Sequence, residues 1–209
     1  MQNIVDLHAV LRSSLASLGD RMNTPADDMS DDMSIADAFR RSMSLLTASV
    51  AVVTTKVEDR PWGMTITACC SVSTAPPTVL ISLGEASATT HAVAEQGEYG
   101  LCLMGTGGVA TAEFAAAPGR PKFLDEPHLA APVAATPCVR GAIAHLDCLV
   151  TRTIPVADHV LFIGEVRGVS FPSSAPTLLY GAREFHRTVP ALQLAGTETD
   201  LHALAYSMW

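Results

Sequence analysis

The sequence predicts a mainly β domain, an antiparallel barrel with a few flanking helices. Short runs rich in Val, Ile and Thr recur along the chain and are separated by Gly, Pro, Asp and Ser. The runs follow one another closely, without the repeated strand–helix–strand units that would build a parallel sheet. At 209 residues, with 48% hydrophobic and 16% charged residues, the chain is long enough for one well-buried domain with appendages.

The two ends of the chain differ from its middle. Residues 3–18 repeat apolar side chains at helical spacing and end at Gly19, which predicts a helix. The stretch that follows is acidic and poor in apolar side chains, as a linker would be. The sequence therefore divides into a helix and acidic linker over residues 1–34, a folded domain over 35–189 and a tail over 190–209.

Within the domain, the spacing of apolar residues and the positions of turn-forming residues predict each helix and strand. Ser34 followed by Asp37 is typical of a helix start. The predicted helices cover residues 35–46, 89–95 and 109–116. The predicted strands cover residues 50–57, 64–73, 78–83, 99–104, 142–154, 160–171 and 178–180. We expect a turn near Gly63 and Met64, a hairpin turn over residues 155–159 and an irregular, proline-rich segment over 118–137.

Composition excludes several classes of function. The net charge is −8 and the sequence has two lysines, which argues against a nucleic-acid partner. No apolar run is long enough for a membrane helix, and no basic, apolar leader is present. The five cysteines have no CxxC spacing, so we expect reduced thiols in a cytoplasmic protein. The histidines show no metal-ligand spacing, so we expect no metal site.

The segment from Arg60 to Pro77 is the most informative part of the chain. After the expected turn it presents small side chains and hydroxyls at mainly alternating positions, which lie on one face of a strand. They are Thr65, Thr67, Ala68, Ser71 and Ser73. Small side chains let a flat ligand approach the backbone, and hydroxyls can hydrogen-bond its polar edge. The alternative is a plain barrel strand with small inward-facing residues.

The order of several short motifs resembles the flavin reductase family. They are Ala38-Phe-Arg-Arg-Ser-Met43, residues 48–55, Gly63-Met-Thr-Ile-Thr67, Ser71-Val-Ser73 with Pro76-Pro77, residues 141–148, Asp158-His159 before residues 160–166, and residues 178–185. The resemblance covers roughly residues 36 to 188. It implies an FMN-binding split β-barrel that forms a homodimer. It also implies hydride transfer from NADH or NADPH to FMN or FAD, and a partner monooxygenase that receives the reduced flavin.

The resemblance also implies where the flavin ring binds. The ring slot is expected at Gly63, Met64, Thr65, Ile66, Thr67, Ala68 and Ser71. The family often has Asn-Ser-Phe where this chain has Thr67-Ala68-Cys69, so its flavin affinity or preference is expected to be unusual. Cys102, in a later strand, stands where the family often has Asn at the edge of the flavin.

Three hydroxyl residues and one histidine are expected to serve the rest of the site. Ser87, Thr89 and Thr90 open a predicted helix, whose N–H groups and dipole attract phosphate. The alternative there is simple helix capping. His159 matches a family motif beside the nicotinamide and flavin, where an imidazole could orient the carboxamide or accompany proton movement. The alternative is a solvent-exposed turn histidine.

Further residues are carried over from the family at the edges of the site. Lys122 and Phe123 resemble a Lys-Phe pair beside the flavin, and Tyr180, Arg183 and Phe185 match a C-terminal element that helps to hold the pyridine nucleotide. A guanidinium suits a pyrophosphate, although Arg183 could equally pair with Glu184 at the surface.

One motif suggests a different fold. Gly105-Thr-Gly-Gly-Val-Ala110 reads as a dinucleotide-binding fingerprint, with acidic residues at about the expected distance. No run of strand–helix–strand units follows, so we interpret the match as coincidental. Two other functions stay open: a flavoenzyme of the same fold that reduces another small molecule, such as a corrinoid or a metal complex, and a flavin-binding or interaction protein without turnover.

Overall fold

The computed structural model describes residues 33–130 and 135–188, and the chain divides into two units, Met1–Met43 and Ser44–Trp209. In the first unit, α2 (Ile35–Ser44) begins as predicted, since Ser34 Oγ accepts a hydrogen bond from the Asp37 N–H at 3.1 Å. The predicted helix over 3–18, the acidic linker before residue 33 and the tail from residue 189 lie outside the described residues. Among the described helices, none is long and apolar enough to cross a membrane.

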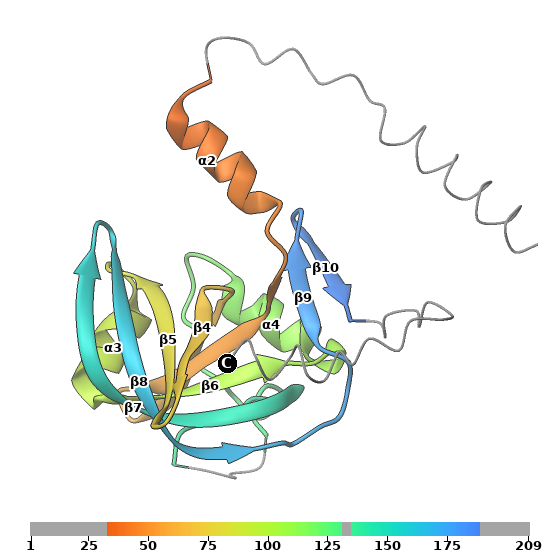
Figure 1. Ribbon diagram of the computed structural model, residues 1–209. Coiled ribbons are helices and arrows are strands. Elements are labelled where there is room, and N and C mark those ends of the chain that lie inside the picture. The colour runs from red at the N-terminus through yellow and green to blue at the C-terminus, as the bar shows by residue number, and fades with distance from the viewer. Residues whose placement is uncertain (1–32, 131–134, 189–209) are drawn as a thin grey trace, which may run out of the picture. The chain divides into compact units, whose positions relative to one another are not determined.

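The second unit is mainly β, which confirms the predicted class (Figure 1). Seven antiparallel strands form one sheet in the order β3-β2-β6-β7-β8-β5-β4. They are β2 (Ala51–Val57), β3 (Arg60–Ile66), β4 (Cys69–Thr74), β5 (Pro77–Gly84), β6 (Glu98–Met104), β7 (Ala142–Val156) and β8 (His159–Ser170). A smaller sheet has the order β1-β9-β10, from β1 (Ala48–Ser49), β9 (Leu178–Gly181) and β10 (Glu184–Arg187).

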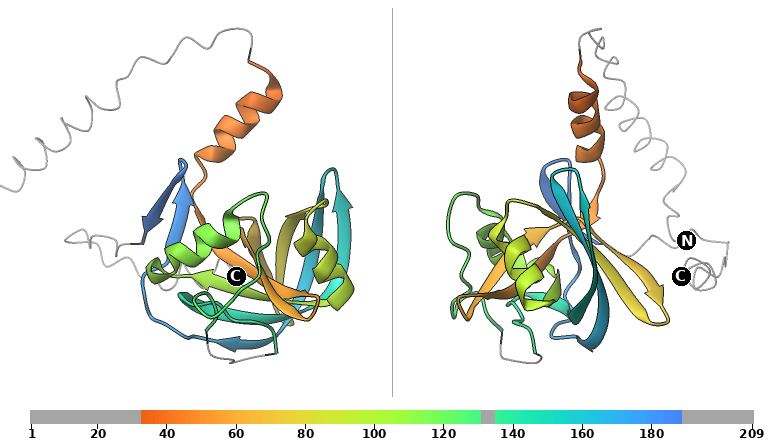
Figure 2. Two further views of the ribbon diagram at one scale, coloured as in Figure 1. Left: turned by 180° about the vertical axis from the view of Figure 1, so that it is seen from behind. Right: turned by 90° about the vertical axis from the view of Figure 1, so that its left-hand side faces the viewer.

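The chain connects the two edges of the larger sheet directly. The edge strands β3 and β4 are joined by Thr67 and Ala68 alone, so the sheet must curl until these strand ends lie a few residues' length apart. The two strands do not pair with each other, which leaves a gap and is consistent with the expected split barrel. The hairpin of β4 and β5, drawn in yellow, projects from the rest of the sheet (Figure 2).

Two expectations for this region were wrong. The single strand predicted over residues 64–73 is two strands, because the chain breaks at Thr67 and Ala68. The turn expected at Gly63 and Met64 lies earlier, at Glu58 and Asp59, whose φ angles are 52° and 58°. Asp tolerates this left-handed conformation better than most residues, whereas Gly63 sits inside β3 and is paired with Thr54. The strand β10 was not predicted at all.

Apolar side chains are buried on both faces of the sheet. Ala51 and Val53 of β2 join an inner cluster that includes Tyr99 and Phe162. Val50 and Val52, which point the opposite way, join a second cluster together with residues of α4 (Val109–Ala116). The helix α3 (Ala88–Gln96) packs against β2 and β6. This burial on two faces explains why β2 reads as a continuous apolar run.

The segment Gly105–Ala110, which resembles a dinucleotide-binding fingerprint, lies in a different structural context, so the match is coincidental, as predicted from the sequence. After β6, the short helix η1 (Thr106–Gly108) and α4 lead to β7, which pairs with β6 antiparallel and so cannot complete a parallel strand–helix–strand unit. The glycines instead allow two backbone segments to meet. A Cβ on Gly141, whose φ is +87°, would lie 2.7 Å from the Gly108 nitrogen.

We expect Gly100→Ala to lower the free energy of unfolding by about 1–3 kcal/mol, because overpacking a filled interior is costly. A Cβ at Gly100 in β6 would lie 2.7 Å from Thr136 Oγ1 and 2.8 Å from His145 Cε1. Urea denaturation of the purified variant measures the loss. Gly107→Ala is the matched control, since a Cβ there meets nothing within 4 Å. Equal effects of the two substitutions would contradict the prediction.

Candidate active site

A cavity of about 620 Å³ opens beside the linker that joins β3 to β4. Its volume falls within the usual range for small-molecule sites, about 300–1,000 Å³. The lining comes from the ends of several elements: β3, β5, α4, β8, β9 and β10. The residues are Val50, Met64, Thr65, Ile66, Thr67, Ala68, Ser82, Leu83, Gly84, Glu113, Ala116, Ala117, Pro118, His159, Tyr180 and Phe185.

One wall is the stretch from Met64 to Ala68, where the sequence predicts a ring slot. The Thr65 hydroxyl donates to the Ala112 carbonyl at 2.7 Å, so it ties β3 to α4 and is engaged within the protein. Thr67 and Ala68 are exposed, and the Ala68 carbonyl accepts a hydrogen bond from the Ser82 N–H at 3.0 Å. The linker is thus fixed through its backbone, while its small side chains leave the cavity open.

The end of α4 supplies a wall that sequence reasoning missed. Glu113, Ala116, Ala117 and Pro118 line the cavity, and α4 stops where Pro118 prevents its continuation. The small alanines keep this wall flat. The available signal was the alanine-rich helix end before the proline-rich segment, but nothing in that pattern indicates which part of the barrel it faces.

His159 lies at the start of β8 and lines the cavity, with its side chain half exposed. Its Nδ1 lies 2.8 Å from the Asp158 carboxylate. This hydrogen bond to His159 holds the pKa of Asp158 below its usual value. In the neutral imidazole, a carboxylate partner favours the proton on Nδ1, which leaves Nε2 to accept a hydrogen bond from a ligand.

Two aromatic side chains form another side of the cavity. Tyr180 in β9 and Phe185 in β10 meet at 5.3 Å between ring centroids in an edge-on arrangement. The turn between these strands uses positive φ angles at Ala182 and Arg183, 50° and 66°. Arg183 is exposed on this turn and does not line the cavity. Tyr180 and Phe185 therefore line the cavity, whereas Arg183 could reach a ligand only from outside it.

The three hydroxyls expected to bind phosphate are engaged within the protein. Ser87 caps α3 and accepts a hydrogen bond from the Thr90 N–H at 3.0 Å, and the Thr90 hydroxyl donates to the Gly84 carbonyl at 2.6 Å. Thr89 is buried and accepts from Trp62 Nε1 at 2.9 Å. Helix capping, the alternative considered from sequence, accounts for the hydrogen bonds of the Ser87 and Thr90 hydroxyls in this structure. Gly84, which precedes the helix, lines the cavity.

The other predicted site residues do not line this cavity. Lys122 accepts a hydrogen bond from the Gly63 N–H through its carbonyl, and burial lowers the pKa of its ammonium. Phe123 packs edge-on against Trp62 at 5.0 Å, and Ser71 is exposed on β4. The Cys102 side chain is fully buried, and its Sγ lies 3.1 Å from His145 Nδ1. This placement does not support a flavin contact by the Cys102 thiol.

Comparison with known proteins decides the family, because residues 43–188 match the flavin reductase like domain. The chain belongs to the flavin reductase family. It is 32% identical over 163 residues to a flavin reductase (NADH) of Kitasatospora aureofaciens, covering 77% of this chain and 85% of that protein. It is 37% identical over 148 residues to a flavin reductase (NADPH) of Lentzea aerocolonigenes, covering 70% and 86%.

The solved structures agree with this family assignment. The styrene monooxygenase flavin reductase from Pseudomonas putida S12 superposes with a TM-score of 0.67 at 29% identity, covering 74% of this chain and 99% of that one. The resemblance inferred from motif order is therefore confirmed, and the protein is a flavin reductase.

Proposed function

We propose that the cavity holds the isoalloxazine ring of FMN or FAD and that NADH or NADPH enters over it from the open side. The observation that carries this proposal is that Thr67, Ala68 and His159 meet at one cavity. A bound flavin would supply the hydride acceptor, at N5, for nicotinamide C4, and the residues of this chain would contribute binding and orientation.

The shape and chemistry of the cavity support a flat, partly polar ligand. Alanines from the linker and from the end of α4 leave space close to the backbone on two sides. The aromatic pair of Tyr180 and Phe185 offers an apolar surface on a third side of the cavity. Thr67 is exposed and brings a hydroxyl that can hydrogen-bond the polar edge of a ring.

His159 is proposed to orient the nicotinamide. Its Nδ1 is held by Asp158, which fixes the ring orientation and leaves Nε2 to accept a hydrogen bond from the carboxamide. Because both residues lie in the turn that starts β8, they can reach a ligand at the mouth of the cavity while the strand holds their backbone.

The proposed assembly is a cytoplasmic homodimer that releases reduced flavin to a separate monooxygenase. The hairpin of β7 and β8 supports self-association, because it exposes Leu149, Ile154, Val156 and Val169 to solvent. The five cysteines form no disulfide in the described residues, which is compatible with a reducing compartment. The styrene monooxygenase flavin reductase is a structural neighbour, and its name supports a monooxygenase as the partner. Sedimentation of the purified protein tests the dimer.

The loss of NADH and NADPH absorbance, with and without added FMN or FAD, tests the proposed reaction. Oxidation that depends on added flavin supports it and identifies the preferred substrates. Oxidation without added flavin would indicate a tightly held flavin and another electron acceptor. Flavin binding without any oxidation would favour a binding protein that lacks turnover.

We propose further that the start of α3, next to Gly84, receives the flavin phosphate. If so, Ser87→Ala should weaken FMN binding several-fold more than riboflavin binding, measured by fluorescence titration. Ser87→Gly is the matched variant, because glycine retains most of the capping stability while it also removes the hydroxyl. FMN binding that is weakened by both variants assigns the effect to the hydroxyl. Equal losses for FMN and riboflavin would contradict the phosphate site.

A further inference from the structure

Outside the cavity, two cysteines and one histidine meet in the interior. Cys102 comes from β6, Cys138 from the segment before β7, and His145 from β7. Their exposed fractions are 0%, 3% and 0%. The two sulfurs and a ring nitrogen all lie within 4.8 Å of one another, and Cys102 Sγ is 3.1 Å from His145 Nδ1. Two sulfurs and one imidazole nitrogen this close can converge on a single ion, whose bonds measure about 2.3 Å to sulfur and about 2.0 Å to nitrogen.

Polar groups on the far side of the imidazole hold the ring in position. His145 Nε2 lies 3.2 Å from Thr136 Oγ1 and 3.5 Å from the Asp147 carboxylate. The Thr136 hydroxyl and N–H both donate to that same carboxylate. A carboxylate behind Nε2 favours the ring proton there, so the lone pair of Nδ1 faces Cys102 Sγ. In metal sites, a carboxylate that accepts a hydrogen bond from one ring nitrogen commonly orients a histidine whose other nitrogen binds the metal.

We infer that Cys102, Cys138 and His145 form a buried binding site for one thiophilic metal ion, either Cu⁺ with these three ligands or Zn²⁺ with a water molecule as its fourth ligand. On binding, each cysteine thiol loses its proton to solvent and the sulfur forms a bond to the ion, while His145 binds through neutral Nδ1 with no change in the oxidation state of any group. The site is separate from the cavity, since none of its three ligands lines it. The inference is therefore independent of the proposed function.

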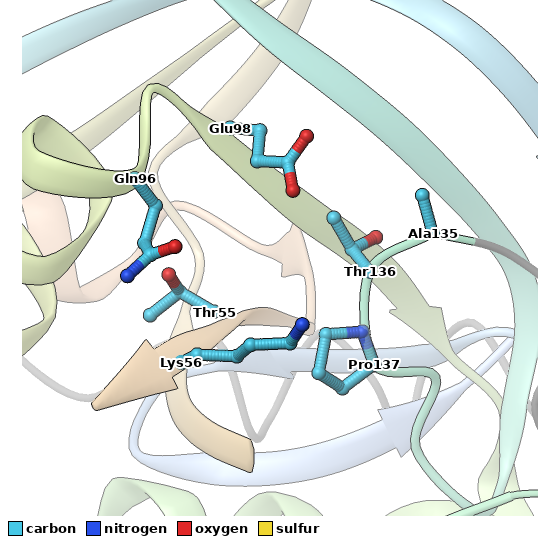
Figure 3. Close-up of a pocket in the computed structure, with 7 residues that line it drawn as sticks. All are labelled: Thr55, Lys56, Gln96, Glu98, Ala135, Thr136 and Pro137. Carbon is cyan, nitrogen blue, oxygen red and sulfur yellow. The ribbon is translucent and has the colours of Figure 1, made fainter. Parts of the chain in front are cut away.

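The backbone beside the cluster leaves space for these side chains. Gly100 lies on β6 beside the cluster, where a Cβ would come within 2.8 Å of the His145 ring and 2.7 Å of the Thr136 hydroxyl. Thr136 also borders two small hollows, of about 10 and 60 Å³. The first is shown in Figure 3, where Thr136 and Pro137 lie near Thr55 and Lys56. The smaller hollow holds at most about one water molecule, and none of the three ligands lines either hollow. An ion would therefore enter during folding or when the segment carrying Cys138 opens.

The consequence for the fold is a link between segments far apart in sequence. An ion held by these ligands would join β6, the segment before β7 and β7 itself. Because the ligands converge only in the folded chain, binding would favour the folded state.

Metal retention by the full-length protein tests the inference. Protein stripped by a chelator under reducing conditions is dialysed against Zn²⁺ in one arm and, in the other, against Cu⁺ held by a weak competing ligand. We expect one ion per chain in at least one arm, together with a rise of several degrees in Tm. The arm that retains metal identifies the ion. Co²⁺ in place of Zn²⁺ should show sulfur-to-cobalt charge-transfer absorption, which reports thiolate ligation without any variant.

Variants assign the ligands. Cys102→Ser, Cys138→Ser and His145→Gln should each abolish retention. Cys148→Ser is the matched control: Cys148 is also buried, at 2% exposure, but its thiol lies outside the cluster, and we expect full retention. Two results would overturn the inference. One is wild-type protein that retains far less than one ion per chain in both arms, which would make the cluster a metal-free hydrogen-bonded network. The other is retention that survives in the cluster variants but is lost in Cys70→Ser, which would assign it to a surface thiol.

Discussion

Ala68→Phe is expected to weaken flavin binding by at least about 100-fold, which corresponds to about 2.7 kcal/mol of binding free energy. Ala68 lines the cavity from the two-residue linker between β3 and β4 and faces open space. A phenyl ring at this position would occupy the volume that we assign to the isoalloxazine. Fluorescence titration with FMN and FAD measures the loss, and turnover at low flavin concentration should fall in parallel.

Stability separates this effect from damage to the fold. Because Ala68 is exposed, Ala68→Phe should leave the midpoint of urea unfolding nearly unchanged. Ala94→Phe is the matched control, since Ala94 is an exposed alanine of α3 that does not line the cavity. If Ala68→Phe bound flavin as tightly as the control, the ring would have to lie elsewhere and the proposed slot would be wrong.

His159→Ala is expected to lower kcat for flavin reduction about 10- to 100-fold, as the loss of an orienting contact near the reacting atoms commonly does. Flavin affinity should change little, because the assigned contact is to the nicotinamide. Stopped-flow measurement of hydride transfer, together with a flavin titration, separates the two quantities. Asp158→Asn should produce a smaller loss, since it weakens the hydrogen bond at Nδ1 but retains the imidazole.

Controls for His159 come from the same chain. His91 is an exposed histidine of α3 that does not line the cavity, and His91→Ala should leave kcat unchanged. His159→Gln retains a hydrogen-bonding side chain and should recover part of the lost rate if the role is orientation. Unchanged kinetics in His159→Ala would show that this histidine is only a solvent-exposed turn residue.

Much of the fold could be predicted because it depends on local patterns. Most strands were placed within a few residues, as was the hairpin turn before His159, since β-branched runs and turn residues act over short distances. The exceptions arise where the local signal is ambiguous. The break at Thr67 and Ala68 lies within a run of small residues that reads as one strand. The turn at Glu58 and Asp59 uses positive φ without glycine.

The sequence predicted several residues that line the candidate site, but not how each side chain is engaged. Met64 to Ala68, His159, Tyr180 and Phe185 line one cavity, and their contacts with flavin and nicotinamide stay predictions. Ser87, Thr90 and Cys102 do not line that cavity, and the sequence shows which polar groups are present but not which partners they contact. Their hydroxyls and thiol are engaged by α3, Gly84 and His145. The wall formed by the end of α4 has no local signature, since its position depends on how the helix packs.

The sequence by itself determined the β-rich class, the order of the strands along the chain and the family, because these depend on short-range periodicity and on motifs in a fixed order. Only the tertiary structure decided which side chains share a cavity and which are buried together. Cys102, Cys138 and His145 show this most clearly: their spacing in sequence suggests no metal ligands, and they converge only because β6 pairs with β7 and Gly100 leaves room for the histidine ring. Such contacts depend on long-range strand pairing, which local patterns do not specify.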